Sequence, residues 1–379
     1  MIVKIGDVIS EYSVRNKFDE NIPVYSVTNE KGFCTGYFSK EVASKDKSTY
    51  KIVPRGYFAY NPSRINVGSV DWQKYEDRVI VSPLYVVFGV SDRLDRQYLL
   101  HYLKSDMMLS FIKEYATGSV RDNLKLADLG KLPINLRPVE EQRQIATTLD
   151  KIDDLIAKRR QQLDKLDELV KSRFIEMFGN FVYERDRWNV CTIGDVADTI
   201  DPQPSHRTPP ISLDGIPYVG IAECNYSTRR IDFEKARKVG QNVLREHTER
   251  YTLDEGDFII GKIGTIGKPF FIPIEQTYTL SANTVLIKPI KGKVVSQYLY
   301  AVFQSEYMDR IIDAEKKSTS QPAFGIQKVR RIEIPMPPLE LQQQFAAFVA
   351  QTDKSKLAIQ KSLDKLEILK KALMQKYFG

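Results

Sequence analysis

The sequence of 379 residues lacks features on which several classes of protein depend. No stretch approaches 18 consecutive apolar residues, and the N-terminus lacks a leader-like pattern, so we expect neither a membrane span nor a signal peptide. Only three histidines occur, and no Cys-x-x-Cys pair, which argues against a metal site. Three widely spaced cysteines suit a reducing cytoplasm better than a disulfide framework: Cys34, Cys191 and Cys224.

Signatures of catalysis are missing as well. An adenine methyltransferase needs Asn/Asp-Pro-Pro-aromatic, and neither Asn61-Pro-Ser63 nor Thr208-Pro-Pro-Ile211 fits. The run Gly261-Lys-Ile-Gly-Thr-Ile-Gly267 has neither dinucleotide-binding nor P-loop spacing. The triplet Glu315-Lys-Lys317 could belong to a nuclease, but such triplets are common by chance. We therefore expect a non-enzymatic chain that holds no cofactor of its own.

The formal net charge is +7, and the first 137 residues are mildly basic. A basic surface permits nucleic-acid binding through phosphate contacts, but many proteins of similar charge bind no nucleic acid. Charge alone leaves the question open.

The most informative feature is one segment that occurs twice, 200 residues apart. The copies begin at Pro138 (PVEEQRQIATTLDKIDD) and Pro338 (PLELQQQFAAFVAQTDK) and align without a gap. The matched positions include Gln142 and Gln342, Asp153 and Asp353, Leu163–Leu166 and Leu363–Leu366, and Phe178-Gly179 and Phe378-Gly379. Because loops tolerate insertions, a gap-free match predicts a continuous helix in each copy. This period is too long for a solenoid and indicates a duplicated domain plus helix.

Shorter anchors extend the repeat into the rest of the chain. Ile5–Val8 resembles Ile193–Val196 at a shift of 188, whereas Gln97–Leu99 matches Gln297–Leu299 at a shift of 200. The second copy should therefore contain an insertion of about 12 residues, most simply between positions 200 and 250. Conserved anchors with divergent sequence between them suggest one scaffold carrying two different surfaces.

Both predicted helices carry an apolar stripe with spacings of three and four, as in a two-helix coiled coil. Arg159 and Arg173 interrupt the stripe of the first helix. Two such helices in one chain most simply pair antiparallel. The predicted seam comprises Leu149, Ile152, Ile156, Leu163 and Leu166, with Val349, Ile359, Leu363, Leu366 and Leu373.

These motifs resemble those of the specificity subunits of type I restriction-modification enzymes. The resemblance rests on Ile334-Pro-Met-Pro-Pro338, the following Glu340-x-Gln342-x-x-Phe345-Ala346, and the earlier copy of this pattern. Gly56–Gly68 and Glu255–Lys268 also resemble two versions of that family's recognition-domain core. The resemblance covers the whole chain.

The resemblance implies a mixed α/β fold with two target-recognition domains, 1–137 and 181–337, and two conserved helices, 138–180 and 338–379. Each domain would read one half of a split target in double-stranded DNA, and the antiparallel helices would set the spacer. The chain would dock two modification subunits, which methylate adenine N6 with S-adenosylmethionine. Restriction/translocase subunits, which use ATP and Mg²⁺, would join them.

Candidate DNA contacts are polar or basic residues near the glycine-rich cores and the domain exits. Arg can pair with guanine edges and Asn or Gln with adenine edges, whereas Lys, Ser and Thr mostly hold phosphates. Arg64 and Arg121 are the strongest candidates. The set in the first domain is Tyr60, Asn61, Ser63, Arg64, Asn66, Ser119, Arg121, Asn123 and Lys125. The set in the second is His206, Arg207, Thr208, Lys262, Thr265, Lys268, Ser318, Thr319, Ser320 and Gln321.

One alternative remains, a coiled-coil scaffold whose two globular domains bind proteins rather than DNA. Steep salt dependence of binding would favour the DNA reader. In both cases strand-like runs at 78–88 and 278–287 precede expected helices near 95–115 and 294–314.

Overall fold

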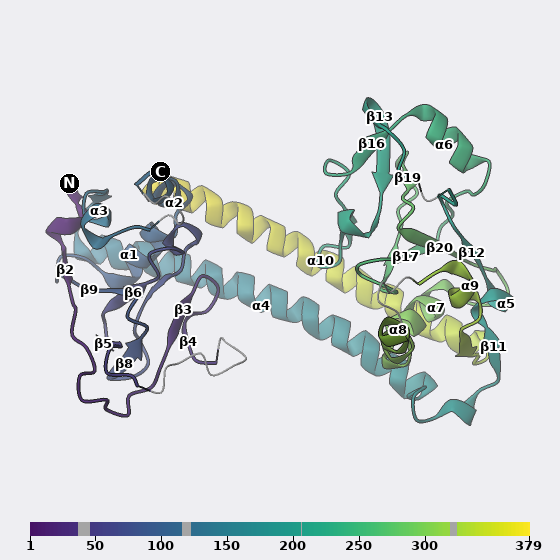
Figure 1. Cartoon of the computed structure of the whole chain (residues 1–379), viewed down its shortest axis with the longest axis horizontal. Coiled ribbons are helices and arrows are strands. Elements are labelled where there is room, and N and C mark those ends of the chain that lie inside the picture. The colour runs from purple at the N-terminus through teal and green to yellow at the C-terminus, as the bar shows by residue number, and fades with distance from the viewer. Residues whose placement is uncertain (37–45, 116–122, 206, 319–323) are drawn as a thin grey trace. The chain divides into compact units, whose positions relative to one another are not determined.

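The computed structural model describes all residues except 37–45, 116–122, 206 and 319–323. The chain forms two compact units (Figure 1). Unit 1 comprises Met1–Lys158 with Leu363–Gly379, and unit 2 comprises Arg159–Ser362. Each unit takes part of both long helices, α4 (Val139–Phe178) and α10 (Leu339–Phe378), so this division differs from the four segments predicted from the sequence.

Unit 1 is built on an antiparallel four-stranded sheet, in the order β2-β9-β6-β7. These strands are Ile9–Glu11, Val86–Val90, Phe58–Tyr60 and Val70–Trp72. Three antiparallel pairs complete the strands: β1 (Ile2–Lys4) with β10 (Pro133–Asn135), β3 (Ser26–Thr28) with β4 (Gly32–Cys34), and β5 (Lys51–Pro54) with β8 (Arg78–Val81). The short helices are α1 (Arg96–Leu103), α2 (Asp106–Tyr115) and α3 (Leu126–Leu129).

Unit 2 repeats this plan with the sheet β12-β20-β17-β18. The strands are Ala197–Ile200, Thr284–Pro289, Phe258–Gly261 and Pro269–Phe271. β11 (Val190–Thr192) pairs with β21 (Glu333–Pro335) as β1 pairs with β10. The helices are α5 (Ile193–Val196), α7 (Ser296–Phe303), α8 (Glu306–Ser318) and α9 (Ile326–Arg330). The expected mixed α/β fold and internal repeat are thus confirmed.

Between β12 and β17, where the sequence predicted an insertion, the second copy carries a larger set of elements than the β3, β4 and β5 described between β2 and β6 of the first copy. They are β13 (Ile211–Val219), β14 (Cys224–Asn225), β15 (Arg230–Ile231), β16 (Arg237–Val239) and α6 (Gln241–Thr248). β13 lies between β16 and β19 (Thr279–Leu280), and β14 and β15 form a separate hairpin.

The repeated glutamines have the same role in both units. Gln142 is fully buried, and its amide oxygen accepts from the backbone N–H of Asp95, 2.8 Å away, at the start of α1. Its amide nitrogen donates to the carbonyls of Arg93 and Arg137. Gln342 repeats the first of these bonds with Val295 at the start of α7. Each long helix is thereby fixed at its start to the domain that precedes it.

The repeated Phe-Gly pairs fix the other ends of the helices. Phe178, at the end of α4, lies fully buried in unit 2, with ring centroids 4.9 Å from Tyr298 and 5.5 Å from Phe345. Phe378, at the end of α10, lies in the core of unit 1 against Tyr98, 5.2 Å away. Gly179 follows α4 with φ +86°, the left-handed conformation that glycine adopts readily after a helix.

Within each unit the two long helices run antiparallel. In unit 1, Asp153 of α4 pairs with Lys370 of α10 at 2.5 Å. In unit 2, Asp167 of α4 pairs with Lys356 of α10 at 2.6 Å. Of the predicted seam residues, Leu149, Ile152, Ile156 and Leu363 are buried, whereas Leu163, Leu166, Val349, Ile359, Leu366 and Leu373 are half-buried.

The structure has strands and helices where the sequence predicted them, but each of these segments is divided in two. Residues 78–88 form two strands in different sheets, because the chain turns at Ser82-Pro83-Leu84, where proline supplies no backbone donor. Residues near 95–115 form the two helices α1 and α2, since the Ser105 hydroxyl accepts from the Met108 N–H and starts α2 afresh. The runs at 278–287 and 294–314 are divided in the same way.

Candidate nucleic-acid interface

Some of the predicted DNA contacts of each domain fall on equivalent loops. In unit 1 the connection 61–69 joins β6 to β7, and in unit 2 the connection 262–268 joins β17 to β18. β6 and β17 occupy the same position in their sheets, and so do β7 and β18. The two loops therefore start from the same point of a duplicated scaffold, although their sequences differ.

The loop of unit 1 is held in shape by its own side chains. The Asn61 amide oxygen accepts from the backbone N–H and the hydroxyl of Ser63, at 3.1 and 3.0 Å. A 3₁₀ turn at Ile65–Val67 follows, and Gly68 ends it at φ +85°. Arg64 precedes this turn with an exposed side chain, and its guanidinium makes no hydrogen bond or ion pair within the described residues. A charged donor is thus presented to solvent on an ordered turn.

This loop lines a cavity of about 660 Å³. The cavity brings together four of the predicted contacts, Asn61, Ser63, Arg64 and Asn123. It also contains residues that the sequence did not single out, among them Ser26, Thr28 and Asn29 around the β3–β4 hairpin, and Leu84, which is 79% exposed. Donors, acceptors and exposed methyl groups in one recess are what contact with base edges requires.

Other predicted contacts in the first domain have different surroundings. Tyr60 was wrongly included, because it is fully buried in the core and its hydroxyl donates to the Leu124 carbonyl at 3.0 Å. Burial also raises the pKa of this phenol. Asn66 is half-buried and Lys125 is exposed, and neither lines the cavity. Ser119 and Arg121 lie outside the described residues.

In the second domain the glycine-rich loop presents Thr265 and Lys268 to solvent. Gly264 and Gly267 adopt φ +76° and +73°, which residues with side chains rarely adopt. Both exposed residues line a recess of about 360 Å³ that also contains Lys171 of α4 and Lys316 of α8. Three lysines at one recess suit a phosphate backbone.

Lys262 was wrongly included, because it is 7% exposed and its ammonium lies 2.8 Å from the carboxylate of Asp201, itself partly buried. A buried lysine paired in this way supports the loop and is not available to DNA. Arg207 and Thr208 are exposed but do not line the recess. His206, Thr319, Ser320, Gln321 and the side chain of Ser318 lie outside the described residues.

A metal site, a membrane-spanning helix or a reactive histidine would also indicate function in the part of the chain that the structure describes. No group of three or more His, Cys, Asp or Glu side chains is placed to hold a metal ion there. Nor does any helix among those residues combine the length and apolar character needed to cross a membrane. His247 is 1% exposed between Gln203 and Thr279, and burial lowers its pKa, so it is a neutral core residue.

The duplicated α/β domain carries a polar loop at the same place in the sheet of each copy. The family model for the type I restriction modification DNA specificity domain matches the chain twice, at residues 2–168 and 185–369. The chain belongs to this family, and the resemblance inferred from the sequence is confirmed.

Individual relatives agree with this assignment. The chain is 22% identical over 301 residues to the type I restriction enzyme MjaVIII specificity subunit of Methanocaldococcus jannaschii, covering 74% of this chain and 69% of that protein. It is 18% identical to the EcoBI specificity subunit of Escherichia coli, covering 89% and 78%. Its fold is similar to that of the type I restriction-modification S subunit from M. genitalium, with a TM-score of 0.57 at 15% identity, covering 100% and 96%.

Proposed function

We propose that this chain reads a bipartite target in double-stranded DNA, with one half-site per domain, as the non-catalytic specificity subunit of a cytoplasmic type I restriction-modification complex. Residues 1–137 and 181–337 are the two recognition domains in this proposal. The supporting observation is the pair of equivalent loops, which start from the same place in duplicated sheets but carry different side chains. A constant scaffold with variable polar loops suits the reading of two different sequences.

In this proposal the long helices set the gap between the half-sites. α4 and α10 each contain 40 residues, so each is about 60 Å long at ~1.5 Å per residue. Readers of two half-sites need a fixed spacing, so that both domains meet the same face of the duplex. Helices anchored at both ends, by Gln142 or Gln342 and by Phe178 or Phe378, provide stiffness that a flexible linker lacks.

The DNA-reading part of the proposal is tested by the loss of Arg64 from the purified complex with its modification subunits. Arg64→Ala should weaken binding to the cognate duplex by about 5- to 150-fold, since a good arginine–base contact contributes roughly 1–3 kcal/mol. Binding to unrelated DNA and assembly with partners should be unchanged. Arg55→Ala is the matched control, because Arg55 is an exposed arginine of the same domain that lies outside the cavity. Equal affinities of the two variants in a fluorescence anisotropy titration would contradict the assigned role of Arg64.

The same titration at several salt concentrations separates the DNA reader from the protein-binding scaffold. Contacts to many phosphates make affinity fall steeply as salt rises. Binding that is absent or insensitive to salt, with partners present, would instead support the scaffold. The family assignment does not favour that alternative.

We further propose that the chain docks two identical modification subunits, one per repeat, and that restriction/translocase subunits join the complex. Leu169 and Leu369 are equivalent positions of α4 and α10, and they are 47% and 46% exposed. Single exposed leucines are ordinary, but the same exposure at both repeated positions suits a duplicated contact. S-adenosylmethionine, ATP and Mg²⁺ would belong to the partners.

Native mass spectrometry tests the stoichiometry directly. Wild type should carry two modification subunits, Leu169→Lys or Leu369→Lys should each carry one, and the double variant none. Tyr75→Lys, at a residue 58% exposed in the loop after β7, is the control and should keep two. A one-to-one complex as the stable active form of wild type would refute the proposal.

A further inference from the structure

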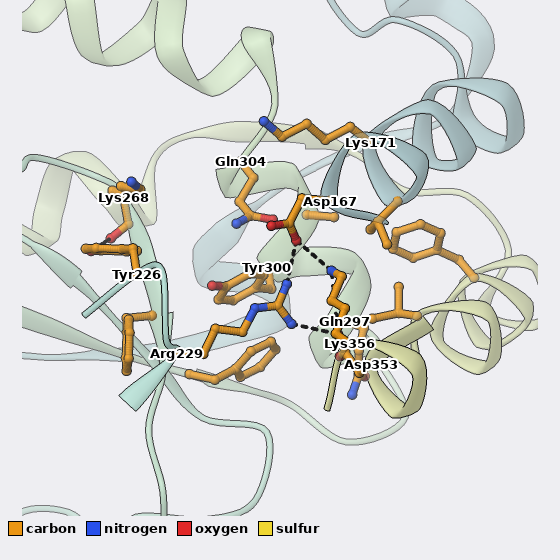
Figure 2. A pocket seen from close by; sticks show the side chains of 16 residues that line it. Asp167, Lys171, Tyr226, Arg229, Lys268, Gln297, Tyr300, Gln304, Asp353 and Lys356 are labelled. Carbon is orange, nitrogen blue, oxygen red and sulfur yellow. Dashed lines mark hydrogen bonds and ion pairs between the residues drawn. The ribbon is translucent and has the colours of Figure 1, made fainter. Parts of the chain in front are cut away.

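The segment between β12 and β17 in the second domain contains a hairpin whose turn reaches both long helices. β14 and β15 pair through Cys224 with Ile231 and Asn225 with Arg230, and Arg229 lies in the turn between them. Figure 2 shows the Arg229 side chain pointing between Asp167 of α4 and Asp353 of α10. Its guanidinium lies 2.8 Å from the first carboxylate and 2.6 Å from the second.

Lys356 of α10 completes a group of four charges, which we call the Arg229 cluster: Arg229, Asp167, Asp353 and Lys356. The Lys356 ammonium is 2.6 Å from Asp167 and 3.7 Å from Asp353, and the residue is 8% exposed. Two cations and two carboxylates balance one another. Because the two carboxylates come from different helices, Arg229 joins the hairpin to both α4 and α10. The planar guanidinium of arginine has several N–H donors and can bind two carboxylates at once.

Arg229 adopts a backbone conformation that is uncommon for a residue with a side chain. Its φ is +55°, a conformation that glycine adopts freely and arginine rarely. Unit 1 uses a different arrangement at the equivalent carboxylate, because Asp153 pairs with Lys370 of the other helix rather than with a residue of the globular domain. Among the described residues, this hairpin link is found in the second domain.

The same hairpin also supports the recognition loop of the second domain. Tyr226 lies in the hairpin turn, and the Lys268 ammonium lies over its ring, 4.0 Å from the ring centroid. The Tyr226 hydroxyl donates to the Lys268 carbonyl at 3.2 Å. Lys268 ends the loop between β17 and β18. A continuous series of contacts therefore connects both helices, through Arg229 and Tyr226, to the loop proposed to touch DNA.

We propose that Arg229 is a positioning residue, which fixes the recognition loop of the second domain on α4 and α10 and thereby restricts the gap length that the complex accepts. This inference rests on the proposed function. Arg229 touches no base in it. When the Arg229 cluster is lost, the loop between β17 and β18 still carries the same side chains, so the preferred bases stay the same. The loop is then no longer held at a fixed position on α4 and α10, so the complex accepts a wider range of gap lengths between the half-sites.

The test is a map of N6-methyladenine in cells that express the full chain with its methyltransferase. Arg229→Asn should leave both half-site sequences unchanged and lower the preference for the native gap over gaps one base pair longer or shorter by about three- to tenfold. Asparagine tolerates the backbone conformation of Arg229. Arg230→Asn is the matched control, since it removes the same charge from the next residue, which is exposed, and should keep wild-type spacing.

Each other outcome is informative. Unchanged gap preference in Arg229→Asn, or altered base preference within the second half-site, would overturn the positioning role while leaving the proposed function intact. Absence of any split motif from the wild-type complex would instead refute the proposed function. If Arg229→Asn yields no folded complex, the double variant Asp167→Asn with Asp353→Asn must widen the accepted gaps, and native strictness there would overturn the inference.

Discussion

Substitution of Phe178 by alanine tests whether the end of α4 is an anchor of unit 2. The ring is fully buried, and its centroid lies 4.9 Å from Tyr298, 5.1 Å from Phe174 and 5.5 Å from Phe345. Buried phenylalanine truncated to alanine typically costs about 3–5 kcal/mol through lost burial and a residual cavity. Phe178→Ala should therefore lower the free energy of unfolding of unit 2 by about that amount.

The two tryptophans of the chain allow each unit to be followed separately. Trp72 lies in unit 1, whereas Trp188 lies in unit 2 and donates its indole N–H to the Phe178 carbonyl at 2.7 Å. Urea unfolding is followed by Trp188 fluorescence in a Trp72→Phe background. Ile175→Ala is the control, since Ile175 is on the same helix but 51% exposed, and it should cost less than about 1 kcal/mol. A loss for Phe178→Ala no larger than that of the control would refute the anchor.

Three further predictions concern the interior of each unit. Gln142→Leu removes three hydrogen bonds made by a fully buried side chain and should destabilise unit 1 by about 2–4 kcal/mol, measured by urea unfolding with Trp72 fluorescence. Burial lowers the pKa of His247, so the contribution of this residue to the stability of the fold should be complete above about pH 6.5 and decline as pH falls through the folded pKa. The melting temperature measured from pH 7.5 to 5 should therefore depend less on pH in His247→Asn than in the wild type. The same pH dependence in both proteins would contradict this. Gly267→Ala should lower the melting temperature more than Gly264→Ala, because of these two glycines only Gly267 has an atom, Ile312 Cδ1, in the space that a Cβ would occupy. Equal decreases in melting temperature for the two variants would contradict this prediction.

The long helices were predictable because their packing constraints recur at a constant shift. Gln142 and Gln342, and Phe178 and Phe378, are conserved between the copies because each pair makes the same contacts in its unit. The sequence did not show that the Phe178 ring packs against Tyr298 and the Phe378 ring against Tyr98. Those contacts join residues far apart in the chain, and only the folded structure brings them together.

The candidate interface was predicted in part, and its errors have a common cause. The loops at 61–69 and 262–268 stand out by their glycine and polar residues, yet composition does not reveal which side chains point inward. Tyr60 is a strand residue of the core, and Lys262 is paired with Asp201, 61 residues earlier in the chain. Leu84 was overlooked because an apolar residue next to proline reads as part of a strand, although here it projects from a turn.

The central claim is that one chain reads two half-sites across a fixed gap. Its most direct test is expression with the proposed modification subunit, followed by long-read mapping of N6-methyladenine. The account predicts a split motif with a constant gap, methylated on both strands. No new methylation from a complex verified as soluble and assembled, or methylation of a single unbroken motif, would contradict it.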